Sequence, residues 1–186
     1  MSHRHVRLAV LTLVTSAVAL GACGDSSGPG NGDNVSESDF PRTATGGDPR
    51  GTYSPNDPLL AWFNLPPAVG VNMSRNSGTG TIEVTGSSAT SGSFTMSNVQ
   101  LDVAGTISGG GVTIPFDFSD VDQGLLTSGS GTWRVLPNNL LEMKPDDPTE
   151  DPDTVGFSTT GRGLFFVTAD TVAPGQIFTA VIAFKR

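Results

Sequence analysis

Apolar and polar residues alternate strictly in one segment near the middle of the chain. Val112, Ile114, Phe116 and Phe118 are separated by polar residues and by one proline, Pro115. A period of two is typical of a strand with one buried face. Because proline cannot donate a hydrogen bond to a strand ladder, Pro115 indicates an edge strand or a bulge.

Within residues 51–186, the longest stretch without glycine or proline, residues 93–104, also alternates, but its phase changes partway along. The apolar residues fall first on one face and then on the other: Phe94 and Met96, followed by Val99, Leu101 and Val103. One extra residue would bring both sets to the same side of a sheet. We therefore expect a β-bulge near Ser97–Asn98.

The last segment, residues 176–185, carries apolar residues on both faces. Four alternate on one face and two lie on the other: Phe178, Ala180, Ile182 and Phe184, with Val181 and Ala183 opposite. This pattern favours a central or well-covered strand.

Five shorter segments also have strand character, namely residues 81–85, 132–136, 140–144, 155–159 and 164–168. Turn residues separate them. Residues 58–67, which hold Trp62 and Phe63, fit either a first strand or a short helix capping one end of a barrel. The chain is therefore predicted to be all-β, with about eight to ten short antiparallel strands and little helix. Either an up-and-down small barrel or a β-sandwich satisfies this pattern.

The N-terminus has a different pattern. Arg4 and Arg7 precede an uncharged apolar run of thirteen residues, 8–20, which is short for a membrane-spanning helix. This arrangement predicts a secretory signal peptide over residues 1–22. The sequence Leu-Gly-Ala-Cys that ends at Cys23 resembles the lipobox of bacterial lipoproteins. The resemblance implies cleavage before Cys23 and acylation of that residue.

Composition changes after Cys23 and again near residue 50. Residues 24–50 are rich in Gly, Ser, Asp and Pro, with only two large apolar residues, Val35 and Phe40. They cannot bury enough surface to fold alone, so residues 23–50 are predicted to be the lipidated cysteine and a flexible tether. Residues 51–186 are predicted to form a single β domain.

Removal of the signal peptide changes the available chemistry. Cys23 is the single cysteine, so no intramolecular disulfide can form, and both histidines, His3 and His5, lie in the signal peptide. The mature chain therefore lacks histidine-based acid–base catalysis and the usual zinc ligands. It keeps 8 basic and 18 acidic residues, a net charge of −10. This balance argues against nucleic-acid binding.

Three patterns could in principle carry chemistry. Residues 24–28 match G-x-S-x-G but lie in the tether without a histidine, so we assign no catalytic residue. The acidic run 146–153 lacks the register of a calcium loop and contains prolines, which favours a solvated loop, although calcium binding stays an alternative. Asp117, Asp120 and Asp122 are assigned to a turn. No metal or cofactor is expected.

A further resemblance covers most of residues 51–186. Gly51–Thr52–Tyr53 opens the domain, Gly131–Thr132–Trp133 precedes residues 139–143 (NLLEM), and Phe184–Lys185–Arg186 ends it. These short motifs resemble strands of the lipocalin-like domains of small bacterial lipoproteins, which implies a barrel with a ligand cavity. The proline-rich segment after Tyr53 departs from that family. Large aromatic residues would either line such a cavity or fill the core: Trp62, Phe63, Phe94, Phe116, Trp133, Phe157 and Phe166.

We therefore expect a non-enzymatic lipoprotein of the cell envelope, tethered through Cys23, whose domain binds a small apolar ligand. The alternative is a β-sandwich interaction module that recognises protein or glycan through loops or edge strands. Gly24, rather than aspartate, follows Cys23, which favours the outer membrane over the inner membrane. The domain is expected to be a monomer in the periplasm or at the cell surface.

Overall fold

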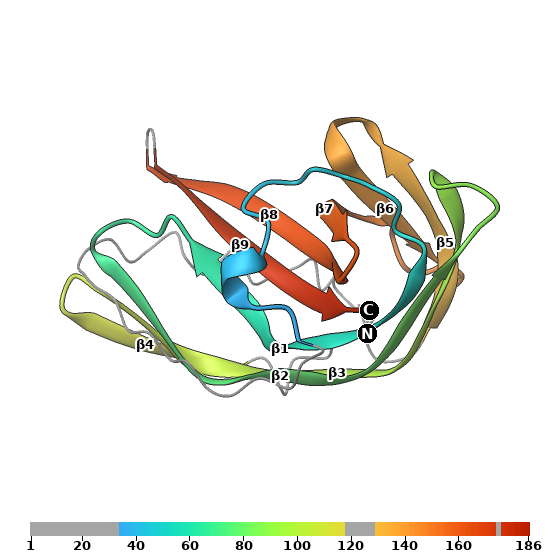
Figure 1. The fold of residues 1–186 in the computed structure, drawn as a ribbon. Coiled ribbons are helices and arrows are strands. Elements are labelled where there is room, and N and C mark those ends of the chain that lie inside the picture. Colours follow the sequence, from blue (N-terminus) through green and yellow to red (C-terminus); the bar gives the residue numbers. More distant parts are fainter. Residues whose placement is uncertain (1–33, 118–128, 174–175) are drawn as a thin grey trace.

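The computed structural model describes residues 34–117, 129–173 and 176–186. The described chain is all-β (Figure 1). Its strands are β1 (Gly51–Phe63), β2 (Val69–Thr85), β3 (Ser91–Gly109), β4 (Val112–Asp117), β5 (Gly129–Leu136), β6 (Leu140–Pro145), β7 (Asp153–Thr160), β8 (Gly163–Ala173) and β9 (Gln176–Lys185). Two short 3₁₀ turns, η2 (Glu37–Asp39) and η4 (Pro137–Asn139), complete the described elements. Within these ranges, no helix has the length and apolar character needed to span a membrane.

The nine strands form one antiparallel sheet that curves round into a ring (Figure 1). The strand order is β2-β1-β9-β8-β7-β6-β5-β3-β4, and an additional pairing of β2 with β3 joins the two sides. Because one sheet closes on itself, the barrel is the correct choice between the two predicted architectures. The number of strands also lies within the predicted range.

The long strand β3 pairs with three other strands. It lies along β2 on one side, while β4 and β5 share its other side. Its register with β2 shifts between Thr79 and Thr81, opposite Asn98, which has a φ of 50°. The bulge predicted near residues 97–98 is thereby confirmed. Among the described residues, β4 pairs only with β3, so Pro115 lies on an edge strand as predicted.

Strand β1 pairs with the end of β2 and leaves it soon after β1 begins. Residues 51–53 of β1 pair with β2, and the rest of β1 follows β9. The freed part of β2, with the matching half of β3 and with β4, forms a three-stranded extension at the lower left of Figure 1. Asn76 bridges the gap, since its Oδ1 accepts from the Leu60 N–H and its Nδ2 donates to the Leu60 oxygen, both at 2.7 Å. The side-chain amide of Asn76 thus takes the place of one pair of main-chain hydrogen bonds between β1 and β2.

The inside of the barrel is filled by side chains. One cluster occupies the end where β1 meets β2, and each member is 8 % exposed or less: Tyr53, Ile82, Val84, Phe94, Met96, Val99, Trp133, Leu141, Met143, Phe157, Leu164, Phe166 and Phe184. A second cluster lies between the extension and β1: Leu59, Leu60, Val103, Phe116 and Ala180. Side-chain packing therefore accounts for most of the large aromatic residues.

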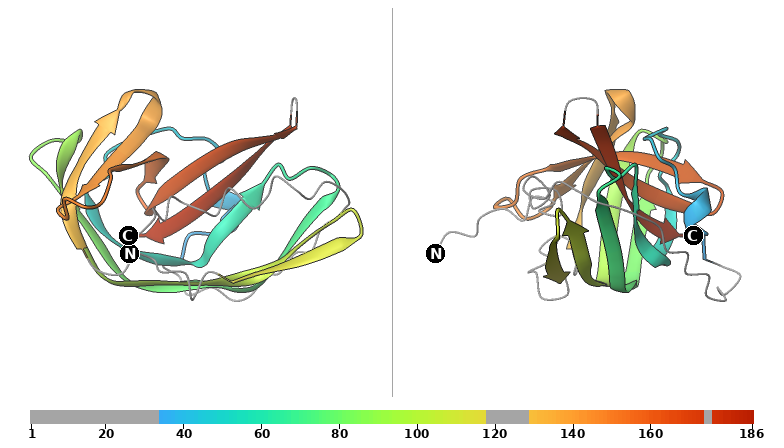
Figure 2. Two further views of the ribbon diagram at one scale, coloured as in Figure 1. Left: turned by 180° about the vertical axis from the view of Figure 1, so that it is seen from behind. Right: turned by 90° about the vertical axis from the view of Figure 1, so that its left-hand side faces the viewer.

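Strand β9 has the predicted bounds, and both of its faces are covered. Phe178 and Phe184 point to the inside, while Val181 and Ala183 are fully buried on the outside. The outer cover comes from residues 34–50, which we call the strap. Figure 1 shows its blue and cyan trace crossing β8 and β9, and the right-hand view of Figure 2 shows it on the outside of the sheet.

The strap corrects the predicted tether. Val35 and Phe40 are 1 % and 4 % exposed, and the Phe40 ring lies 5.5 Å from the ring of Phe165 on β8. Buried Asn56 holds Val35, because its Oδ1 accepts from the Val35 N–H at 2.7 Å and its Nδ2 donates to the Val35 oxygen at 2.8 Å. Residues 34–50 cannot fold alone, but they pack against the apolar outer face of β8 and β9. The boundary at residue 50 is therefore wrong.

The structure decides one open strand prediction and corrects another. Of the two alternatives for residues 58–67, the first strand is correct, since residues 58–63 form the end of β1. Strand β2 begins at Val69 instead of residue 81, because its glycine- and asparagine-rich first half is paired with β3 along its length. Tertiary pairing here overrides weak local preference.

Candidate functional site

The strap leaves part of the outer face of β8 and β9 uncovered, and a groove of about 670 Å³ lies there. This volume is in the range of sites that hold small molecules or short peptide segments. The groove is lined by Arg42, Thr43, Ala44, Asn64, Leu140, Asp153, Thr154, Val155, Gly156, Val167, Thr168, Ala169, Ile177 and Thr179. These residues come from the strap, from β6 to β9 and from the turn after β1.

The groove exists because β7 and β8 diverge. Residues 156–160 of β7 pair with β8, whereas residues 153–155 pair only with β6. From Thr168 onward, β8 pairs only with β9 among the described residues. Gly156 stands at the fork, and a Cβ there would lie 2.6 Å from the Val167 oxygen and 3.1 Å from the Ala44 Cβ. Glycine thus allows the last β7–β8 pair to form directly under the strap.

Hydrogen bonds fix the strap side of the groove. Gly46 forms a parallel bridge to β7, in which its N–H donates to Phe157 at 2.8 Å and its oxygen accepts from Thr159 at 2.9 Å. The Ser158 hydroxyl donates to the Thr43 oxygen at 3.1 Å and accepts from the Thr45 N–H at 2.9 Å. The rim of the groove is therefore preformed.

The groove combines an apolar floor with one charge on either side. Val167 and Thr179 are buried in the floor, whereas Ile177 is 54 % exposed. The Arg42 guanidinium lies 4.8 Å above the Phe63 ring, a cation–π contact, and it forms no ion pair within the described residues. The Asp153 carboxylate accepts from the Thr154 N–H at 2.9 Å. Such a site can hold an apolar group and orient it by charge.

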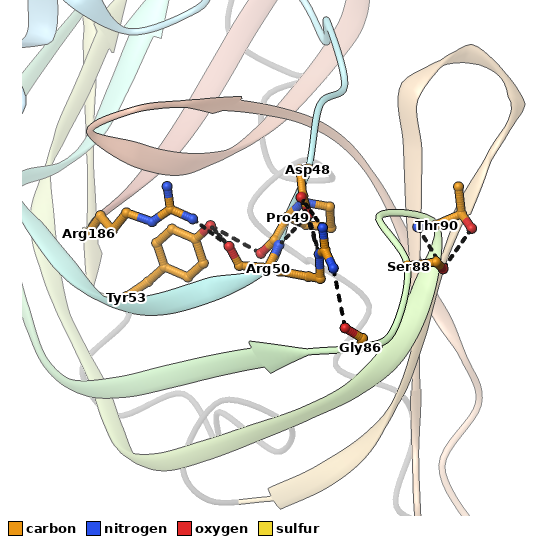
Figure 3. A network of polar contacts seen from close by, with 8 residues as sticks. All are labelled: Asp48, Pro49, Arg50, Tyr53, Gly86, Ser88, Thr90 and Arg186. Carbon is orange, nitrogen blue, oxygen red and sulfur yellow. Dashed lines mark hydrogen bonds and ion pairs between the residues drawn. The ribbon is translucent and has the colours of Figure 1, made fainter.

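A separate polar network joins the last residues of the strap to the end of the barrel where β1 pairs with β2 (Figure 3). Arg50 pairs with Asp48 at 2.6 Å and donates to the Gly86 oxygen at 3.3 Å, while the Tyr53 hydroxyl donates to the Pro49 oxygen at 3.1 Å. The side-chain hydrogen bond from Arg50 lowers the pKa of Asp48 to about 2, and burial raises the pKa of Tyr53. Neither group is tuned for proton transfer near neutral pH, so the network acts as a structural clamp.

One buried polar atom inside the second cluster stands out. The indole N–H of Trp62 is buried and has no hydrogen-bond acceptor among the described residues, and its ring lies 5.8 Å from that of Phe178. By contrast, the Trp133 indole donates to the Thr85 oxygen at 2.8 Å.

The residues singled out from the sequence are spread over the molecule. Cys23, Asp120, Asp122 and the G-x-S-x-G segment lie outside the described residues. Asp117 is not in a turn, because it lies in β4 and pairs with Arg75, whose Nε also lies 3.2 Å from Asp102. Of the aromatic residues, Phe63 is on the outer face, and the other six belong to the two inner clusters or pack against them.

The acidic run 146–153 forms hydrogen bonds within its own loop and to β5. Asp147 accepts from the Thr149 N–H and hydroxyl at 2.8 and 2.7 Å, and Ser130 donates to Asp146 at 2.6 Å. In the described parts of the chain, no three His, Cys, Asp or Glu side chains are grouped to hold a metal ion. These contacts describe a stiffened surface loop.

The groove itself was not predicted from the sequence. Gly156 and Arg42 lie in segments with no motif, and they meet only because the strap crosses the fork between β7 and β8. The available signal was the pair Val35 and Phe40 in an otherwise polar segment, since apolar residues in a tether indicate a contact with the domain.

Comparisons with known proteins add no relative. No family model, curated protein or solved structure matches this chain.

Proposed function

We propose that this chain is a non-enzymatic lipoprotein of the bacterial cell envelope, anchored through acyl chains on Cys23, whose barrel binds a partner in the groove. The groove between β7, β8 and the strap is the observation that carries the binding role. The packed inner clusters favour an outer binding surface over a ligand cavity in the lumen. The interaction-module alternative is thus kept, on a barrel instead of a sandwich.

The anchoring proposal rests on the lipobox and is compatible with the position of the strap. Ten residues lie between Cys23 and Asn34, where the described domain begins. A fully extended chain spans about 3.3–3.6 Å per residue, so the domain lies within about 40 Å of an anchor at Cys23. We place the anchor in the outer membrane and the domain in the periplasm or at the cell surface.

The anchor is tested by the mass and partitioning of the mature protein. We expect the chain from membranes to begin at residue 23, to carry acyl chains, and to enter the detergent phase of Triton X-114. The Cys23→Ser variant should lack the acyl mass and remain in the aqueous phase. An unmodified Cys23 in membrane-extracted protein would remove the lipoprotein assignment.

The binding role is tested by photo-crosslinking in the native envelope. A photoreactive amino acid replaces Ala169 in the groove, and the control replaces Thr95, which is exposed on β3. We expect a discrete crosslinked product from position 169 that is absent from position 95. Equal products at both positions would argue against a groove-specific partner.

A small apolar ligand is the second candidate, and the unpaired indole N–H of Trp62 favours it. That donor, next to Phe178, could serve a ligand that combines an apolar body with one acceptor. Native mass spectrometry of protein from its own host tests this candidate. A carried small molecule that is lost in Trp62→Phe and retained in Trp133→Phe would support it.

A further inference from the structure

Among the described residues, an edge of β8 lacks the proline or the covering segment that protects β4 and β7. Edge strands expose a row of main-chain donors and acceptors, and proteins usually block them with proline, with charge or with a covering segment. Here β4 carries Pro115, and residues 157–159 of β7 are covered by Gly46 of the strap. The edge of β8 from residue 168 to residue 173 contains no proline, its single charged residue is Asp170, and it pairs only with β9 among the described residues.

That edge opens into the groove. Thr168 and Ala169 line it, and residues 153–155 of β7 form the opposite wall with their β8-facing side unpaired. The β8–β9 hairpin continues beyond Gly156, where the pairing of β7 with β8 stops, toward the upper left of Figure 1. A polar main-chain edge therefore runs beside the apolar floor made by Val167 and its neighbours.

We propose that the groove binds an extended peptide segment of a partner protein, which adds to β8 as a further strand. Main-chain hydrogen bonds would come from the β8 edge, and alternate apolar side chains would enter the groove. The inference rests on the proposed role of the groove as a binding site and names its occupant.

The positive charge of Arg42 indicates which kind of peptide the groove would bind. Arg42 lies on the strap rim with a cation–π contact to Phe63 and, within the described residues, no ion pair. An acidic residue of the peptide next to its apolar stretch would complement Arg42. A second copy of this chain is a poorer occupant, because the mature sequence has a net charge of −10 and like charges repel.

The test uses the mature chain with Cys23→Ser and a displayed library of random twelve-residue peptides as the probe. Selection is followed by binding to three variants, Ala169→Lys and Arg42→Gln in the groove and Thr95→Lys as an exposed strand control on β3. We expect selected peptides with alternating apolar residues and a carboxylate. Their affinity should fall at least about tenfold in Ala169→Lys and in Arg42→Gln but stay unchanged in Thr95→Lys.

Two further measurements separate strand addition from contact through side chains alone. Methylation of alternate main-chain nitrogens in a selected peptide should weaken binding about tenfold, because it removes donors and keeps side chains. Hydrogen exchange at residues 168–173 should slow when the peptide binds. Equal affinity of the methylated peptide, with unchanged exchange, would overturn strand addition.

The outcomes also separate this inference from the proposed function. If an apolar dye binds in an Ala169-dependent way and no peptide does, the groove remains a binding site and its peptide occupant is refuted. If neither dye nor peptide responds to Ala169→Lys, both proposals fail. An Ala169-dependent dimer in sedimentation velocity would assign the groove to a second copy and overturn the inference.

Discussion

Replacing Asn56 tests whether a single buried amide holds the strap on the barrel. Asn56 is fully buried, and its side chain bonds both polar groups of Val35 as well as the Pro58 oxygen, at 2.7–2.9 Å. In Asn56→Ala these three groups lose their partner. An unsatisfied buried group costs about 1–3 kcal/mol, and water entering beside the strap offsets part of this, so we expect a loss of about 2–5 kcal/mol in the free energy of unfolding.

Urea unfolding followed by tryptophan fluorescence measures the loss, and hydrogen exchange locates it. The control is Asn72→Ala, the same change at an exposed position of β2, for which we expect an effect within about 0.5 kcal/mol. The Val35 amide should exchange much faster in Asn56→Ala, while amides of the inner cluster stay protected under native conditions. A loss below about 1 kcal/mol, or unchanged exchange at Val35, would refute the idea that Asn56 fixes the strap.

Three other experiments test the clamp around Arg50 and the two tryptophan indoles. Tyr53 is the single tyrosine of the chain, so absorbance near 295 nm reports its ionisation, which we expect at a higher pH in the folded protein than in the urea-unfolded chain. Because the pKa of Tyr53 is raised in the folded state, the stability that it contributes is present below about pH 10 and is lost as pH rises further. The lowered pKa of Asp48 gives stability that is present above about pH 4 and is lost as pH falls toward 2. Asp48→Asn should therefore be less stable than wild type at pH 6 and equal to it near pH 2. An equal stability difference at both pH values would exclude the pairing with Arg50 as the cause of that difference. Trp133→Phe should lose about 1–3 kcal/mol more than Trp62→Phe in urea unfolding, because only the former removes an indole hydrogen bond to a described acceptor, and equal losses would contradict this contrast.

Local patterns predicted much of the sheet. The alternation in residues 112–117, the phase change near Asn98 and the two apolar faces of β9 each depend on neighbours within one strand, so the sequence carried them directly. Pro115 marked its edge for the same reason, since the missing donor belongs to the residue itself.

The strap and the groove depend on contacts between distant segments. Val35 meets Asn56, and Gly46 meets Ser158, across 21 and 112 positions of sequence. Composition described the strap as a polar tether, because two apolar residues are too few to fold alone. The divergence of β7 and β8 leaves no local trace either, since both segments keep ordinary strand patterns on each side of the fork.

The place where the strap begins determines how the barrel would carry a mechanical load. A pull applied through residue 33 would reach Asn34 first, whose oxygen accepts from Arg162 at 2.9 Å and whose side chain accepts from Lys185 at 2.8 Å. Val35 would pass the load on to β1 through Asn56. Strands β1 and β9 and the turn between β7 and β8 would thus share the tension before it reached Arg42 at the groove. On the proposed anchoring and binding roles, a pull on the start of the strap would be resisted by these contacts before it reached a partner in the groove.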